Sequence, residues 1–176
     1  MPFTPLHMGP GLLLKQIFRR HFSLTMFGIT QVAIDIEPLV RMYRGDSVIH
    51  AHLHSYLGST LVAVVVLVSA RPLCTVILRR WNQETSFHKV EWLSASLPIT
   101  WTSAIIGTFI GAWSHVFLDS LMHYDLRPLL PFSKTQPLLN LLGNTQPGLY
   151  CLIAGLLGFS AWLISAWKTK CRIPGA

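Results

Sequence analysis

Three ionisable side chains recur at intervals of four residues at the end of a long apolar run. They are His115, Asp119 and His123, and the apolar run before them begins near Leu93. On a helix this spacing places side chains one turn apart on nearly one face. A single buried histidine is typical of a hydrogen-bonded core residue. Three ionisable groups in register each need a partner, however, and a shared cation satisfies all of them. The pattern therefore fits a metal site and a proton relay equally well, because both would use the same residues.

A second concentration of histidine lies at residues 50–54. On a helix His50 and His54 are one turn apart on the same face, whereas His52 points away from both. A histidine pair at this spacing is a known zinc-ligand geometry. An exposed histidine-rich loop is the alternative interpretation.

Two carboxylates follow another apolar stretch, which covers residues 22–34. Asp35 and Glu37 follow it directly, and Pro38 limits how far that helix can continue. The two acids either meet the lipid headgroups or act as hard oxygen ligands. His7 precedes a short helix expected over residues 11–20, and it is either an exposed histidine of the terminal segment or another ligand.

The elements that must position these residues are apolar helices. Of the 176 residues, 51% are hydrophobic and 12% are charged, against about 25% charged in soluble domains. Residues 93–114 and 147–167 contain no charge, and about 20 apolar residues suffice to cross a bilayer core. Residues 55–70 and 22–34 are shorter apolar runs. We expect an all-α, polytopic membrane helical bundle with about four to five membrane helices, some of them short, in a single integral-membrane domain over residues 1–176.

The distribution of basic residues predicts how this bundle is oriented in the membrane. The formal net charge of +7 is better explained by anchoring at a membrane surface than by nucleic acid, because no basic face has interleaved aromatic residues. If the segments around residues 19–20, 71–92 and 168–172 lie in the cytoplasm, that side holds ten of the fourteen Lys and Arg residues. The ten are Lys15, Arg19, Arg20, Arg71, Arg79, Arg80, Lys89, Lys168, Lys170 and Arg172.

This topology brings imidazoles and carboxylates from four segments to the opposite, non-cytoplasmic face. They are Asp35, Glu37, His50, His54, His115, Asp119 and His123, and His7 joins them if the helix from Pro10 to Arg20 runs inward. All except Glu37 are candidate metal ligands, and Asp35 and Glu37 are candidate catalytic bases. Histidine mixed with carboxylate fits a divalent metal, zinc first, with manganese or iron as alternatives and one or two ions per site.

Four segments also resemble a known family. Residues 4–11 (TPLHMGPG), 34–38 (IDIEP), 50–55 (HAHLHS) and 114–133 (SHVFLDSLMHYDLRPLLPFS) are similar to the motif blocks of inner-membrane, metal-dependent hydrolases. Some members of that family are under DNA-damage control, and the family is compared with zinc-dependent phospholipase C. The resemblance implies a bacterial inner-membrane location. The positions that match the family's metal residues are His7, Asp35, His54, His115 and Asp119.

The chain departs from the commoner family pattern in two blocks. Residues 34–38 stand where that pattern reads Pro-Asp-x-Asp-His. Residues 50–55 stand where it reads His-Arg-Gly-x-Thr-His-Ser and are one residue shorter. Either His50 or His52 therefore takes the place of the first histidine of that block.

Two functions fit these observations. The first is a membrane-embedded metal-dependent hydrolase acting on a lipid or a lipid-linked phosphate or ester, with Arg127 or Arg41 as a phosphate contact. The second is a non-enzymatic membrane protein, such as a metal or proton transporter or a scaffold that uses the cluster structurally. A site without an open coordination position would favour the second function. The expected partners are membrane lipids and not nucleic acid.

Overall fold

The structure, a computed structural model, describes residues 4–139, 141 and 146–170 of the chain. These residues form five α-helices and two short 3₁₀ turns and contain no strand, which confirms the all-α prediction. The helices are α1 (Thr4–Phe18), α2 (Leu24–Arg44), α3 (Tyr56–Phe87), α4 (Trp101–Ser120) and α5 (Pro147–Lys170), and the turns are η1 (Arg19–His21) and η2 (Glu91–Leu93).

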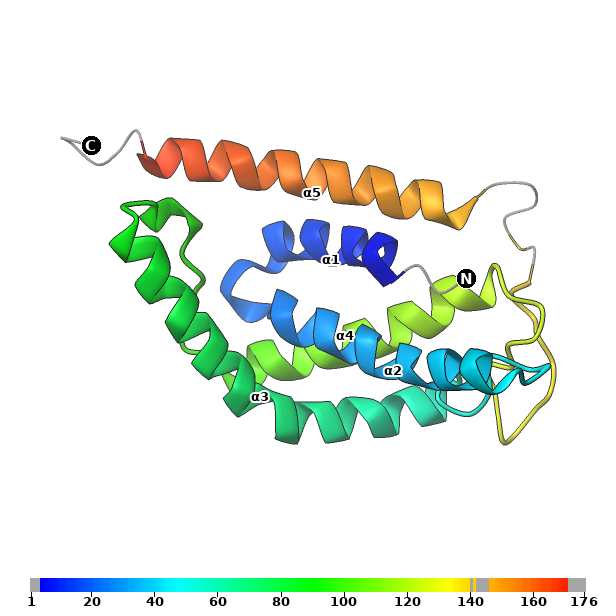
Figure 1. Ribbon diagram of the computed structural model, residues 1–176. Helices are drawn as coiled ribbons and strands as arrows, with labels where there is room; N and C mark the ends of the chain where they lie inside the picture. The colour runs from blue at the N-terminus through cyan, green and yellow to red at the C-terminus, as the bar shows by residue number, and fades with distance from the viewer. Residues whose placement is uncertain (1–3, 140, 142–145, 171–176) are drawn as a thin grey trace.

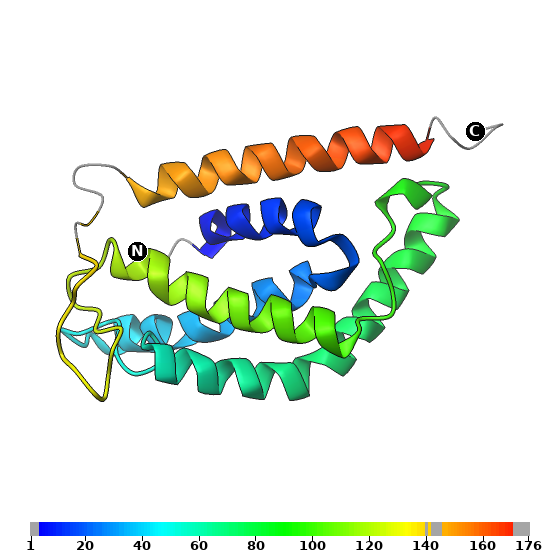
Figure 2. The ribbon, with the colours of Figure 1, turned by 180° about the vertical axis from the view of Figure 1, so that it is seen from behind.

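The helices run back and forth along one direction (Figure 1). α1 lies between α5 on one side and α2 and α4 on the other, and α4 packs on both α2 and α3. The view from behind shows the same order of helices (Figure 2). The start of α1, the end of α2, the start of α3, the end of α4 and the start of α5 therefore share one end of the bundle, at the right of Figure 1. We call this the site end, and the other the basic end.

Three of the helices are long and apolar enough to cross a membrane, which fits a membrane protein. They are α3, α4 and α5, the last over Pro147–Lys168. Few residues of α3 and α5 are buried within the bundle, so their apolar side chains face outward. In a bilayer these faces contact lipid, because hydrocarbon accommodates apolar side chains at no cost. α1 has 15 residues, fewer than the roughly 20 that a full span needs.

Pro38 does not limit its helix as predicted, and Pro72 does not end a helix either. α2 continues through Pro38 to Arg44 and ends at Gly45, whose φ of 76° is the left-handed conformation common after a helix. Asp35 and Glu37 consequently lie inside α2. α3 contains Pro72, bends visibly in Figure 1 and continues to Phe87. Most of the segment expected as a basic loop over residues 71–92 is therefore helical.

The histidine-rich segment at 50–55 is a loop, and not the first turn of a helix. α3 begins only at Tyr56, because the Ser55 side chain caps it by accepting a hydrogen bond from the Gly58 amide at 3.0 Å. The amides ahead of that cap are held by carboxylates from elsewhere in the chain, Glu37 and Asp125. A segment whose N–H groups bind side chains in this way has no need of helical hydrogen bonds.

Small residues allow α4 to approach α2 closely. Ser103, Gly107 and Gly111 are buried on the face of α4 that meets α2, as their four-residue spacing predicts. A Cβ atom at Gly107 would collide with the carbonyl oxygen of Ser23, and the Ser23 amide donates to the Ser103 carbonyl at 3.1 Å. This contact fixes α4 against α2, and these two helices carry most of the candidate site.

Candidate metal centre

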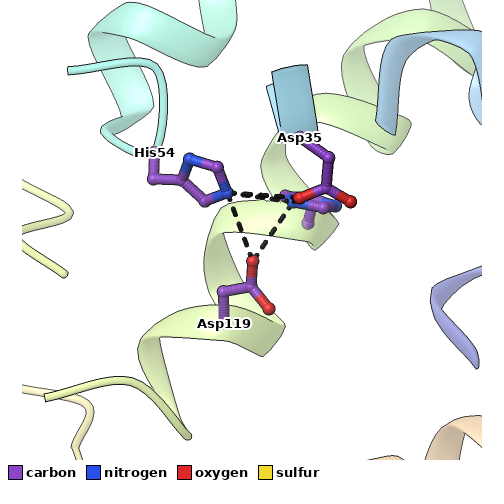
Figure 3. A group of neighbouring side chains, drawn as sticks. Asp35, His54 and Asp119 are labelled. Atoms are coloured by element: carbon purple, nitrogen blue, oxygen red, sulfur yellow. Dashed lines mark hydrogen bonds and ion pairs between the residues drawn. The ribbon is translucent and has the colours of Figure 1, made fainter. Parts of the chain in front are cut away.

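Four side chains from three separate segments meet at the site end. Asp35 comes from α2, His54 from the loop before α3, and His115 and Asp119 from successive turns of α4. One nitrogen or carboxylate oxygen from each lies within 4.8 Å of those from the other three. In Figure 3 Asp35, His54 and Asp119 point toward one another. We call these four residues the first group.

The spacing within the first group matches that of ligands on one ion. His115 Nε2 lies 3.1 Å from Asp119 Oδ2, 3.2 Å from Asp35 Oδ1 and 3.3 Å from His54 Nε2. His54 Nε2 lies 3.4 Å from Asp119 Oδ2 and 3.6 Å from Asp35 Oδ1. Donors bound to a tetrahedral zinc ion at about 2.0–2.1 Å are about 3.3–3.4 Å apart. The five distances thus lie around the value that a shared zinc ion imposes.

Burial strengthens this argument. His54 and His115 are fully buried and Asp119 is 1% exposed. Neither carboxylate oxygen of Asp119 has a hydrogen bond of acceptable geometry within the described part of the chain. A buried carboxylate without such bonds is costly unless a cation compensates it. The first group therefore has the chemistry, the spacing and the burial of a divalent-metal site.

The electrostatic potential at His54 is strongly negative. Burial by itself lowers the pKa of an imidazole, but the carboxylates of Asp119, Asp35 and Glu37 outweigh burial and raise the pKa of His54 to about 10. The same potential attracts a divalent cation, which would replace that proton.

Glu37 holds the loop that carries His54. Its Oε1 accepts from the His52 amide at 3.0 Å and its Oε2 from the Leu53 amide at 2.8 Å. Oε2 also lies 3.7 Å from His54 Nδ1, the ring nitrogen on the side away from the first group. Burial raises the pKa of Glu37, but His54 and the two amides outweigh it and lower that pKa to about 2. Glu37 is thus placed as a charged support for His54 and lies outside the first group.

His7 stands behind the first group and outside it. Its Nδ1 is 3.4 Å from His115 Nδ1, and its Nε2 is 3.6 Å from Asp119 Oδ1. Metal-binding histidines usually donate their second ring N–H to a neighbour. His7 occupies that neighbouring position for His115, so α1 contributes to the site by orienting a residue of α4.

A second group lies beside the first and consists of His50, His123 and Asp125, whose donor atoms lie within 4.8 Å of one another. The rings of His50 and His123 are stacked, with centroids 4.1 Å apart. Burial and the neighbouring His50 lower the pKa of His123 to about 4. Burial raises the pKa of Asp125, but hydrogen bonds from the His50 amide and ring lower it to about 2. At neutral pH the group thus contains a carboxylate and an uncharged His123.

The remaining residues that the sequence predicted for the site lie outside both groups. His52 is exposed, so His50 is the histidine of its segment that joins His54 near the site. Arg41 contacts Glu37 and Asp46, each at 3.5 Å. Arg127 donates to the Tyr124 and Leu126 carbonyls and to Gln136. Both guanidinium groups thus stabilise loops at the site end, and their role as phosphate contacts stays a prediction.

Asp125 is the residue that sequence reasoning missed. It lies two residues after His123, beyond the end of α4 and in a segment interrupted by proline. The four-residue spacing of His115, Asp119 and His123 does not extend to Asp125. Its proximity to a histidine was the only available signal, and its partner His50 is 75 residues away in sequence.

A cavity of about 1020 Å³ lies at the basic end of the bundle, lined by apolar side chains, by several serines and threonines, and by Lys15, Arg19 and Arg20. None of the metal-ligand candidates lines it. That cavity is therefore separate from the two groups at the site end.

Comparisons of the chain with models of protein families, with curated proteins and with solved structures found no match.

Proposed function

We propose that the chain is a membrane-embedded, metal-dependent hydrolase that cleaves a lipid or a lipid-linked phosphate or ester. The observation that carries the proposal is the first group, in which the two imidazole nitrogens lie 3.1–3.6 Å from each other and from both carboxylates. Zinc is the preferred ion because this donor set mixes nitrogen with carboxylate oxygen, and manganese or iron is the alternative. The resemblance of four segments to a hydrolase family agrees with this choice.

The residues of the chain have separate roles in this proposal. Asp35, His54, His115 and Asp119 hold the cation, and Glu37 and His7 keep the two imidazoles in place. A divalent cation held there would supply a Lewis acid that polarises a phosphoryl or acyl group. With four protein ligands it would have to take up water as a fifth ligand, whose pKa it would lower toward neutrality. In the reaction a water oxygen bonds to phosphorus or to the carbonyl carbon, and the ester oxygen leaves.

Of the two carboxylates predicted as the base, Asp35 is the better placed. Both oxygens of Glu37 accept backbone N–H groups, whereas Asp35 Oδ1 faces the nitrogens of His115 and His54. With Oδ1 toward the cation, the second carboxylate oxygen of Asp35 would accept the proton of the attacking water, and that proton would pass to the leaving ester oxygen.

A lipid substrate follows from the outer surface of α2. Val32, Ile36 and Leu39 flank Asp35 in sequence and are 57%, 54% and 63% exposed. Large apolar side chains exposed in a row mark a surface that contacts lipid or another apolar partner. A lipid could therefore reach the site end from the side of the bundle, with its acyl chains against α2 and its polar headgroup near Asp35.

The test is metal content measured beside hydrolysis on detergent-purified protein. Wild type, His115→Ala, Asp119→Ala and the exposed control His88→Ala are analysed for zinc, manganese and iron by elemental mass spectrometry. Each is then assayed on phosphodiester and lipid-phosphate substrates in mixed micelles. We expect wild type and the control to hold metal and hydrolyse a substrate, and the two site variants to lose both. Folded wild-type protein that takes up no added cation would rule out the hydrolase.

Transport of metal ions or protons is the second candidate function. It is favoured by Gln31 and Thr108, whose buried polar side-chain atoms have no hydrogen-bond partner in the described residues. Gln31 precedes Asp35 by four residues on α2, and Thr108 precedes His115 by seven on α4. These atoms could form part of a polar path leading inward from the first group. Zinc or proton uptake by proteoliposomes that Gln31→Leu abolishes, without any hydrolysis by wild type, would support this candidate.

A further inference from the structure

The second group is fixed by a carboxylate and leaves one imidazole nitrogen unused. Asp125 Oδ2 accepts from the amides of Ile49 and His50, each at 3.0 Å, and Asp125 Oδ1 lies 3.0 Å from His50 Nδ1. Because Asp125 acts as the acceptor, His50 Nδ1 is the donor and carries the ring hydrogen. His50 Nε2 is then an acceptor. It is buried and has no hydrogen-bond partner within the described chain, and His50 itself is 4% exposed.

A carboxylate on one side of an imidazole with an unused nitrogen on the other is the usual arrangement of a metal-binding histidine. His50 therefore has the supporting contact of a ligand, and it lies outside the first group. Its ring stacks on His123, with centroids 4.1 Å apart, and contacts His54, with centroids 4.9 Å apart. The His50 ring thus contacts both His123, which follows the end of α4 at Ser120, and His54 of the first group.

Asp119 connects the two groups. Its Oδ2 faces the nitrogens of His115 and His54 at 3.1 and 3.4 Å. Its Oδ1 lies 3.6 Å from His7 Nε2 and 3.9 Å from His123 Nε2. Neither oxygen has a hydrogen bond of acceptable geometry in the described residues. One carboxylate whose two oxygens face two sets of imidazoles is suited to bridge a pair of cations about 3.5–4 Å apart.

We infer that the chain binds a second divalent cation next to the first, held by His50 and His123, with Asp119 as the shared carboxylate and Asp125 as the residue that positions His50. This inference rests on the proposed function for its first cation and extends it to a two-metal centre. Phosphate esters are the substrate class that such a pair serves best, because two cations stabilise both the attacking and the leaving oxygen.

The two-metal arrangement also indicates which cation has an open coordination position. The first group offers four protein ligands, which by themselves close a tetrahedral site, whereas catalytic zinc usually keeps a position for water or substrate. The second site has only two imidazoles and a shared carboxylate, so one position stays open. It is also the more accessible of the two, since the His123 side chain is 19% exposed, whereas that of Asp35, the most exposed ligand of the first group, is 11% exposed. Substrate would therefore bind first at the second cation.

The test counts ions on the full chain in detergent. Protein is equilibrated with Zn²⁺, passed over a chelating resin and analysed by elemental mass spectrometry. The variants are His50→Gln, His123→Gln and Asp125→Asn, with His88→Gln as a control because that histidine is exposed and lies at the basic end. A second sample is loaded with Mn²⁺ and examined by electron paramagnetic resonance, which distinguishes a coupled pair from an isolated ion.

We expect two zinc ions per chain in wild type and the control, one in His50→Gln and His123→Gln, and binding of the second ion weakened about 10–100-fold in Asp125→Asn. The manganese signal should change from that of a coupled pair to that of an isolated ion in the first two variants. One zinc per chain in wild type would overturn the inference, even if the variants fail to fold. A second zinc retained in both His50→Gln and His123→Gln would overturn it as well. This test does not measure hydrolysis. Two bound zinc ions in a protein without hydrolase activity would therefore support the two-metal inference and refute only the proposed function.

Discussion

The smallest change that should affect the centre without removing a ligand is at Glu37. Its carboxylate accepts the His52 and Leu53 amides and lies beside the outer nitrogen of His54. Glu37→Gln keeps the shape but removes the charge and one acceptor oxygen. Loss of a supporting partner of this kind typically weakens metal affinity about 10–100-fold. Competition with a chelator of known affinity measures the change. Glu84→Gln, at an exposed glutamate, is the control, and equal affinity in the two variants would contradict the role assigned to Glu37.

Metal uptake should depend on pH in a direction set by His54. Its pKa is raised to about 10, so below that pH the imidazole carries a proton that a cation must displace. The apparent affinity should therefore rise about tenfold for each unit of pH between about 6 and 9, and fall as the solution becomes acidic. Calorimetry in buffers of different ionisation enthalpy should detect the released proton. An affinity that is flat over this range would contradict the displacement of a proton from His54.

The residue types of the candidate site could be predicted from the sequence, but only part of their grouping could. The spacing of His115 and Asp119 on one helix face is a local property, and α4 displays it as expected. The division into two groups depends instead on contacts such as that between His50 and Asp125, which are distant in sequence. Glu37 was predicted as a base because its type fits, and only the structure shows that loop amides occupy its carboxylate.

At the scale of the helices, the close contact between α2 and α4 should be sensitive to a single methyl group. A Cβ atom at Gly107 would overlap the carbonyl oxygen of Ser23, which is backbone and cannot rotate away. Gly107→Ala should lower the free energy of unfolding by about 1–3 kcal/mol, the usual effect of overpacking. Gly148→Ala in α5 is the matched control, because its Cβ would meet only the Leu6 side chain, at 3.5 Å. Thermal unfolding in detergent compares them, and equal midpoints would contradict the packing argument.

Helices were easier to predict than their ends. Long uncharged runs located α4 and α5 because a helix in a membrane is recognised by composition alone. The end of α2 was predicted wrongly, because Pro38 lies inside that helix, and α3 continues through Pro72 well beyond the apolar run at 55–70. The loop at 50–55 could not be distinguished from a helix by spacing, because the carboxylates that bind its amides come from α2 and from beyond α4.

At the scale of the whole molecule, the two ends of the bundle differ in charge and should face opposite compartments. Arg79 and Arg80 near the end of α3 lie at the basic end with Arg19 and Arg20, whereas the groups of histidine and carboxylate lie at the site end. Basic residues are retained in the cytoplasm during insertion, so the site end should be non-cytoplasmic. Tyr43 and Phe87 report on the two ends, being 93% and 80% exposed at the ends of α2 and α3. With the native cysteines replaced by serine, Tyr43→Cys should react with a membrane-impermeant maleimide in intact cells, and Phe87→Cys only after the membrane is disrupted. The reverse pattern would place the site in the cytoplasm and exclude substrates confined to the outer leaflet.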